Sequence, residues 1–461
     1  MHPYRPKRKI FIIFIVFFAI FITGQAGASF TVEDEKKLGK EFHEKLLKSQ
    51  VLIEDERINS YVGKIGRRIL SSTEKAPFDF QFFVIRSNAI NAFATPGGYV
   101  YVNQGLITLV ENESELAAVL AHEIAHVNSR HIADIIDKSK KLNIATMAAV
   151  LAGAFLGGGG EMTAAIAGFS MAAATSLNLK YSREHEEEAD RLGAVYLANT
   201  GYDGGAMLNF LKVMRRYEFY SNSIPSYFLT HPGTDERLAY LDALVQTGFA
   251  RKGAESIVGR LKRIQTVLLL EGGDPDTNLK HFREGLKRNP NDIDDLYGVA
   301  ATEARQGLTP QSLEHFQQAL KLAPEDVDIL KDLGISCFRI GQTAQAVTYL
   351  KKAASLTEGN EEILLYLGRS YDNRGDYAAA LSIYRQLEKK KTDDPEIYYN
   401  LAMAYGKTNN PGESHYNFGL YFKKKQRLDS AMFHFHLALK YYPQDSEKAR
   451  QIQSEIATIK K

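Results

Sequence analysis

The chain has 461 residues, and its 44% hydrophobic and 24% charged residues are ordinary for a globular protein, which excludes a disordered chain and indicates two or three folded domains. Residues 1–28 contain four basic residues and no acidic one, so the formal net charge of +2 becomes −2 for residues 29–461. This small negative charge gives no electrostatic basis for binding nucleic acid. Cys337 is the only cysteine, so an internal disulfide is excluded.

The N-terminal segment has the three parts of a secretory signal peptide. Basic residues between Arg5 and Lys9 precede the apolar run 10–22, and Ala26-Gly27-Ala28 has the small residues of a cleavage site. We therefore expect residues 1–28 to be a signal peptide that is cleaved near Ala28. The alternative is an uncleaved anchor in the inner membrane formed by residues 10–22, a run that is short for a membrane span.

Two strands are expected after a helical stretch over residues 31–76. Residues 79–86 and 99–102 are aromatic and β-branched, and a Pro-Gly-Gly turn precedes the second of them. The segment between them, residues 91–98, is expected to bring the edge of a strand close to the helix that contains His122 and His126, described below. An exposed edge there would hydrogen-bond an extended peptide substrate, and the alternative is a hairpin turn without a ligand. The candidate edge residues are Asn91, Ala92, Phe93 and Ala94.

The segment around which the chain is organised is the pentad His122-Glu123-Ile124-Ala125-His126. Apolar residues at helical spacing surround it, and Asn112 with Glu115 has the form of a capping box ahead of them. Positions four apart share one face of a helix, so His122 and His126 are candidate ligands of one zinc ion, at about 2.0–2.1 Å each. Glu123 lies beside them as the candidate base for a zinc-bound water. The alternative is an incidental polar face of a surface helix.

Residues 142–156 and 162–179 are two uncharged, alanine-rich arms, separated by four glycines at 157–160 and by Glu161. Each arm is too short to cross a bilayer, so a helical hairpin with a glycine turn is expected. Core packing is one interpretation of this hairpin. A mobile lid over the metal, or a face that touches a membrane or an unfolded protein, is the other.

An acidic helix that begins near Tyr181 is expected to supply the third ligand. Glu186 and Asp190 share a face, so Glu186 would complete a His2Glu set while Asp190 orients a ligand histidine. His131 and His185 are competing ligands. Ile132 occupies the position at which another zinc peptidase class has its third histidine, so we interpret His131 as a surface residue.

A His-Pro loop precedes the helix predicted at 235–245. His231 is a candidate extra ligand or hydrogen-bond donor to the metal site, and Arg237 is a candidate stabiliser of negative charge during catalysis.

Taken together, the HEIAH pentad, the acidic EEEAD segment ending at Asp190, the HPGTDER loop at 231–237 and the NAFATPGG segment at 91–98 resemble one family of zinc metallopeptidases. This family contains the CAAX prenyl endopeptidases, HtpX and the β-barrel assembly-enhancing proteases. The resemblance implies one zinc ion per chain. It implies that His122, His126 and Glu186 are the ligands, Glu123 the catalytic base and Asp190 an orienting residue. It also implies that His231 approaches the zinc and holds the site closed, with Arg237 in the same loop.

The second half of the chain repeats with a period of 34 residues. Leu333-Gly334 recurs as Leu367-Gly368, Ala346 as Ala380 and Tyr371 as Tyr405, and residues 418–443 restate the pattern. This period is typical of tetratricopeptide repeats, with small residues where two helices approach closely. Such helix pairs stack into a solenoid with a groove for peptides or partners. Cys337 is expected to be buried in this packing.

The expected fold class is therefore an α+β, mostly α, zincin-like metallopeptidase domain at 29–255, followed by an all-α tetratricopeptide solenoid at 256–461. The resemblance extends to proteases that carry such repeats, and it implies a periplasmic zinc endopeptidase of a Gram-negative-type bacterium, acting in outer-membrane protein quality control. Its expected partners are unfolded or misassembled envelope proteins and, through the repeats, the outer-membrane assembly machinery, with peripheral membrane contact through 142–179 as a further expectation. The alternative function is a chaperone or assembly scaffold whose metal site is latent and closed by His231.

Overall fold

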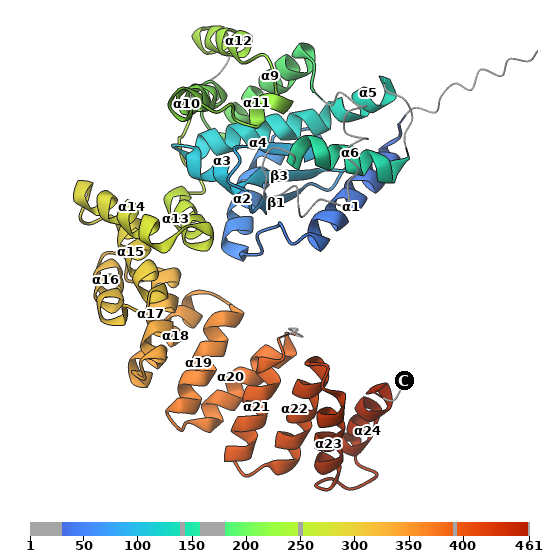
Figure 1. Cartoon of the computed structure of the whole chain (residues 1–461), viewed down its shortest axis with the longest axis vertical. Coiled ribbons are helices and arrows are strands. Elements are labelled where there is room, and N and C mark those ends of the chain that lie inside the picture. Colours follow the sequence, from blue (N-terminus) through green and yellow to red (C-terminus); the bar gives the residue numbers. More distant parts are fainter. Residues whose placement is uncertain (1–29, 139–142, 157–179, 248–251, 391–393, 460–461) are drawn as a thin grey trace, which may run out of the picture. The chain divides into compact units, whose positions relative to one another are not determined.

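The computed structural model describes residues 30–138, 143–156, 180–247, 252–390 and 394–459. The chain divides into two compact units (Figure 1). The first contains the residues up to Glu54 and Val62–Ile257, and the second contains Asp55–Tyr61 and Val258–Lys461. The predicted signal peptide, the four-glycine turn and the second arm of the alanine-rich hairpin lie outside the described residues.

The first half of the chain is mostly helical with one small sheet, as predicted. Its strands are β1 (Gln81–Ile85), β2 (Ala92–Thr95) and β3 (Tyr99–Asn103). Its helices are α1 (Val32–Lys48), α2 (Glu56–Leu70), α3 (Gln104–Leu109), α4 (Glu113–Asn128), α5 (His131–Lys138), α6 (Ile144–Leu156), α9 (Arg183–Thr200), α10 (Ala206–Ser221), α11 (Tyr227–Thr230) and α12 (Thr234–Gln246).

The sheet has the strand order β1-β3-β2, with β3 parallel to β1 and antiparallel to β2. Phe93 of β2 pairs with Tyr101 of β3, and the turn between these strands contains Gly97 and Gly98, both with positive φ angles. β2 is therefore one arm of a hairpin and also the edge strand of this sheet, while its pairing with a peptide substrate stays a prediction.

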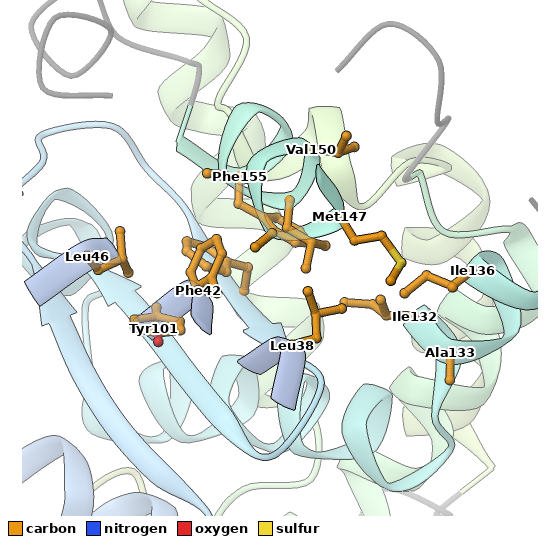
Figure 2. Close-up of a cluster of buried hydrophobic side chains, with 14 of the residues drawn as sticks. Leu38, Phe42, Leu46, Tyr101, Ile132, Ala133, Ile136, Met147, Val150 and Phe155 are labelled. Atoms are coloured by element: carbon orange, nitrogen blue, oxygen red, sulfur yellow. The ribbon is translucent and has the colours of Figure 1, made fainter. Parts of the chain in front are cut away.

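Helix α6 packs into the core of the first unit (Figure 2). Its Met147, Val150 and Phe155 side chains are buried in one cluster with Leu38 and Phe42 of α1. The Phe155 ring also stacks on Phe93 of β2, with ring centroids 4.6 Å apart. For this first arm of the alanine-rich segment, core packing is the interpretation that the structure supports. None of the helices among the described residues is long and apolar enough to span a membrane.

The second unit consists of consecutive helix pairs, which confirms the predicted repeats. Its helices after residue 258 are α13 (Leu261–Gly272), α14 (Pro275–Arg288), α15 (Ile293–Arg305), α16 (Thr309–Leu322), α17 (Val327–Arg339), α18 (Thr343–Leu356), α19 (Glu361–Asn373), α20 (Tyr377–Lys389), α21 (Glu396–Lys407), α22 (Pro411–Lys424), α23 (Leu428–Leu439) and α24 (Glu447–Ile459). Cys337 is fully buried in α17, as expected.

Small residues mark the closest helix contacts in the repeats. A Cβ atom on Gly334 would lie 2.7 Å from the Leu350 side chain, and one on Gly368 would lie 2.5 Å from the Tyr384 ring. Such distances are shorter than ordinary van der Waals contact, so only glycine lets these helix pairs approach so closely. The recurring glycines of the 34-residue pattern are therefore packing positions.

Candidate metal centre

Helix α4 carries the HEIAH pentad through the interior of the first unit. Its N-cap is Asn112, whose side chain accepts a hydrogen bond from the Glu115 backbone N–H. The Glu115 carboxylate accepts from the backbone N–H of Glu111, one residue before the cap, so the predicted capping box is present in a shifted form. The side chains of His122, Glu123 and His126 are 0–2% exposed. The alternative of an incidental surface face is therefore wrong.

Four side chains bring ligand atoms together, and these are His122, His126, Glu186 and His231. The Nε2 atoms of His122 and His126 are 2.9 Å apart, and His122 Nε2 lies 3.4 Å from Glu186 Oε2. His126 Nε2 lies 3.6 Å from Glu186 Oε1. His231 Nδ1 is 3.3 Å from His122 Nε2 and 3.0 Å from Glu186 Oε1. A tetrahedral zinc ion with ligands at 2.0–2.1 Å requires ligand atoms roughly 3.3 Å apart, so these residues fit zinc in size and in donor type.

Helix α9 supplies the acidic side of the site. Its N-cap is Ser182, and Gly193 lets its backbone pack against α4 near His122, where a Cβ atom would lie 3.3 Å from the His122 backbone nitrogen. This approach brings Glu186 to the ligand group and places Asp190 Oδ1 2.9 Å from His122 Nδ1. Burial alone would lower the pKa of His122, but the hydrogen bonds with Asp190 and Glu186 outweigh it and raise that pKa to about 9.

Arg237 of α12 holds both carboxylates of α9. Its Nη1 atom lies 2.7 Å from Glu186 Oε2, while Nε and Nη2 donate to the two oxygens of Asp190 at 2.8 and 2.7 Å. Burial would raise the pKa of Glu186, but the Arg237 charge together with the charge of His231 and the hydrogen bonds from His122 and His231 outweighs it and holds this pKa well below its usual range. The guanidinium is buried and directed at these carboxylates, so its contacts are those of a residue that orients Glu186 and Asp190.

His231 follows α11 and is enclosed by two tyrosine rings. Tyr227 stacks on it with centroids 4.3 Å apart, and the Tyr181 centroid lies 5.1 Å away. Its Nε2 atom is 3.4 Å from Glu123 Oε1. The histidine of the predicted loop thus reaches the ligand group and the candidate base together.

Glu123 is a fully buried carboxylate that lies close to the backbone of Ala94 in β2 and to His231. Burial raises its pKa above the usual range, and the charges of His231 and His122 oppose this shift only in part. A base with a raised pKa is better matched to proton transfer near neutral pH. Helix α4 also packs against β2, so the edge strand lies next to the helix that carries Glu123. Of the predicted edge residues, Ala92, Phe93 and Ala94 lie in β2, whereas Asn91 precedes it and donates a hydrogen bond to the Phe155 carbonyl at 3.1 Å.

The interpretation of His131 as a surface residue is wrong. It is only 3% exposed, and its Nδ1 atom lies 2.8 Å from His126 Nδ1. His185 stacks on His131 with centroids 4.3 Å apart and interacts with Asp134 at 3.1 Å. Neither histidine belongs to the ligand group. The sequence carries no signal for this burial, because it depends on how α5 and α9 fold back against α4.

Three family models match the chain. Residues 54–245 match "Peptidase family M48", and residues 297–361 and 338–404 match tetratricopeptide repeat models. The beta-barrel assembly-enhancing protease of Yersinia pestis is 35% identical over 216 residues, which are 46% of this chain and 44% of that protein. The protein of the same name from Escherichia coli (strain K12) is 33% identical over the same shares of both chains. The match therefore spans less than half the length of these two relatives.

A third relative is matched over most of its length. The protease HtpX homolog of Desulfatibacillum aliphaticivorans is 32% identical over 228 residues, which are 40% of this chain and 70% of that protein.

Proposed function

This chain belongs to peptidase family M48, and we propose that it is a zinc-dependent endopeptidase that degrades unfolded or stalled proteins of the bacterial envelope, in outer-membrane protein quality control. The observation that carries the proposal is the buried group of His122, His126, Glu186 and His231, whose spacing fits a tetrahedral zinc ion. The shared name of two relatives, beta-barrel assembly-enhancing protease, supports the choice of substrate class.

In the proposed reaction, His122, His126 and Glu186 hold the metal and Glu123 is the base. A bound zinc ion would polarise the scissile carbonyl and lower the pKa of its water towards about 7. Glu123 accepts the proton of the attacking water and returns it to the leaving amine. Asp190 fixes the ring of His122, and Arg237 holds Glu186 and Asp190 in place through the contacts described above.

The substrate backbone is proposed to pair with the edge strand β2. Only one side of β2 is paired in the sheet, and β2 packs on α4 beside Glu123. An extended peptide on the other side would pass close to the base.

The repeats are proposed to capture client proteins. The second unit contains a cavity of about 320 Å³, whose lining includes Tyr297, Phe316 and Arg339. Aromatic rings beside charged groups suit an unfolded segment of mixed composition. By the same proposal the partners include the outer-membrane assembly machinery. We propose that residues 1–28 are a signal peptide that directs the chain to the periplasm, and that the part of 142–179 outside the buried helix α6 makes a peripheral membrane contact.

His231 is proposed to hold the site closed in this state. An active zinc peptidase keeps one coordination position for water, and His231 Nδ1 takes the fourth corner of the ligand group here. This geometry favours a second candidate function, a chaperone or assembly scaffold with a latent protease. Substituting His231 with Ala tests the role of this histidine. Rising cleavage supports a closed switch, and loss of cleavage supports a catalytic role.

The proposed activity is tested by cleavage of an unfolded model protein by residues 29–461. Wild type, Glu123→Gln and His231→Ala are compared, with zinc content measured on each preparation. We expect Glu123→Gln to keep its zinc and to lose cleavage by about 10²–10⁴-fold, the contribution of a general base. Zinc-dependent cleavage by Glu123→Gln at the wild-type rate would overturn the assignment. Absence of cleavage in wild type and in His231→Ala, with zinc bound, would support the scaffold function.

A further inference from the structure

The two histidines of the pentad are supported in different ways. His122 Nδ1 meets a carboxylate directly, because Asp190 Oδ1 is 2.9 Å away. His126 Nδ1 meets another imidazole, that of His131, at 2.8 Å. Ligand histidines usually donate their second N–H to a carboxylate, a carbonyl or water. The contact between His126 and His131 therefore needs its own explanation.

The hydrogen positions in this contact follow from metal binding. His126 presents Nε2 to the ligand group, so Nε2 has to be free of hydrogen and the N–H of the neutral ring lies at Nδ1. This N–H donates to His131 Nδ1, which leaves the hydrogen of His131 on Nε2. The opposite arrangement, with His131 as the donor, would put the hydrogen of His126 on Nε2 and block metal binding.

An acceptor lies where this arrangement requires one. His131 Nε2 is 3.4 Å from Glu188 Oε2, and the other oxygen of that carboxylate accepts from the Ser129 hydroxyl at 2.9 Å. The His131 ring is further held by the His185 ring, which stacks on it at an interplanar angle of 19°. Donors and acceptors therefore match along the whole path from His126 through His131 to Glu188.

We propose that His131 is a positioning residue for the metal ligand His126, and that it carries the influence of the Glu188 carboxylate to that ligand. This inference rests on the metal site of the proposed function. On this view α9 orients both ligand histidines, His122 directly through Asp190 and His126 indirectly through Glu188. It gives a role to His131, the first residue of α5.

The test measures zinc affinity of the full mature chain by competition with a chelator, and the visible absorption of the cobalt-substituted protein. His131→Leu removes the acceptor, and we expect the zinc dissociation constant to rise about 10–100-fold, the usual effect of losing a group behind a ligand. His131→Asn places an amide oxygen near the former Nδ1 position and is expected to restore most of the affinity and the cobalt spectrum.

A matched pair on α9 tests the second step. Glu188→Ala is expected to weaken zinc binding several-fold and to alter the cobalt spectrum, whereas Glu187→Ala, at its exposed neighbour, is expected to change neither. Zinc affinities equal to wild type in both His131→Leu and Glu188→Ala would overturn the proposal. If His131→Leu does not fold, equal affinities in Glu188→Ala and Glu187→Ala overturn it alone. Wild-type protein that binds no zinc would refute the proposed function itself. Wild-type and variant proteins that bind zinc equally well would refute only the role of His131.

Discussion

The metal centre and the helix contacts of the repeats are both buried, but they differ in residue type. Polar and charged side chains build the first, and small and large apolar side chains build the second. At the metal centre α4 and α9 bury His122, Glu123, Glu186 and Asp190, and Arg237 is buried against them. In the repeats several close helix contacts pair a glycine with a large apolar or aromatic side chain, such as Gly334 with Leu350 and Gly368 with Tyr384.

This difference predicts different responses to substitution. When one charged side chain of a buried pair is removed, its partner is left buried without a compensating charge. Each polar residue of the metal centre is therefore stabilised by several others. A repeat contacts mainly its neighbours, so a packing change there has a local cost. Substitutions at the centre should therefore affect metal and stability together, and those in the repeats should affect stability alone.

The largest effect is expected from Glu186→Ala. It removes the one carboxylate of the ligand group, so zinc affinity should fall by more than about 100-fold, beyond the effect of a group behind a ligand, and cleavage should be lost with it. Zinc content after dialysis against a chelator checks this, with Glu187→Ala as the control. An unchanged zinc content in Glu186→Ala would place the third ligand elsewhere.

Arg237→Leu is expected to have the next largest effect. It leaves Glu186 and Asp190 buried without their cation, which should destabilise the zinc-free first unit by about 3–5 kcal/mol. Hydrogen exchange of the α4 and α9 amides measures this loss. Arg215→Leu is the matched control, because Arg215 pairs with Glu218 and Asp235 in partly exposed contacts, each worth about 0–1 kcal/mol. Equal protection in the two variants would contradict the orienting role of Arg237.

The smallest effect is expected from a single methyl group in the repeats. Gly368→Ala forces a contact with Tyr384, and overpacking of this kind costs about 1–3 kcal/mol, offset in part by the better helix propensity of alanine. Hydrogen exchange in α19 and α20 should report the loss while zinc content stays unchanged. Gly406→Ala is the control, since its Cβ atom would meet the Ser414 side chain, at 3.3 Å from the hydroxyl oxygen and 4.0 Å from Cβ. Loss of zinc in Gly368→Ala would contradict the expectation that packing changes in the repeats leave the metal centre unaffected.

The repeats and the pentad helix could be predicted because their signals are local and periodic. Leu333-Gly334 and Leu367-Gly368 recur at one spacing, and the structure places both glycines at tight helix contacts. The pentad puts His122 and His126 on one face through helix geometry alone, and the cap at Asn112 is where the sequence predicts it.

The rest of the site depends on contacts between distant segments. Arg237 meets Glu186 and Asp190 across about fifty residues of sequence, and its fork-shaped contact with both carboxylates has no local signature. The misjudged burial of His131 has the same cause, since its neighbours His126 and Glu188 come from two different helices. Sequence patterns thus identify the chemical groups, and the packing of α4 against α9 decides how they are held.

We propose that His122, His126 and Glu186 hold a zinc ion beside Glu123. Anomalous scattering at the zinc edge, measured on crystals of the zinc-loaded Glu123→Gln protein, locates the ion. We predict one ion per chain, about 2.0–2.2 Å from Nε2 of both histidines and from a carboxylate oxygen of Glu186. An ion bound to other side chains, or none at this site in excess zinc, would contradict the account.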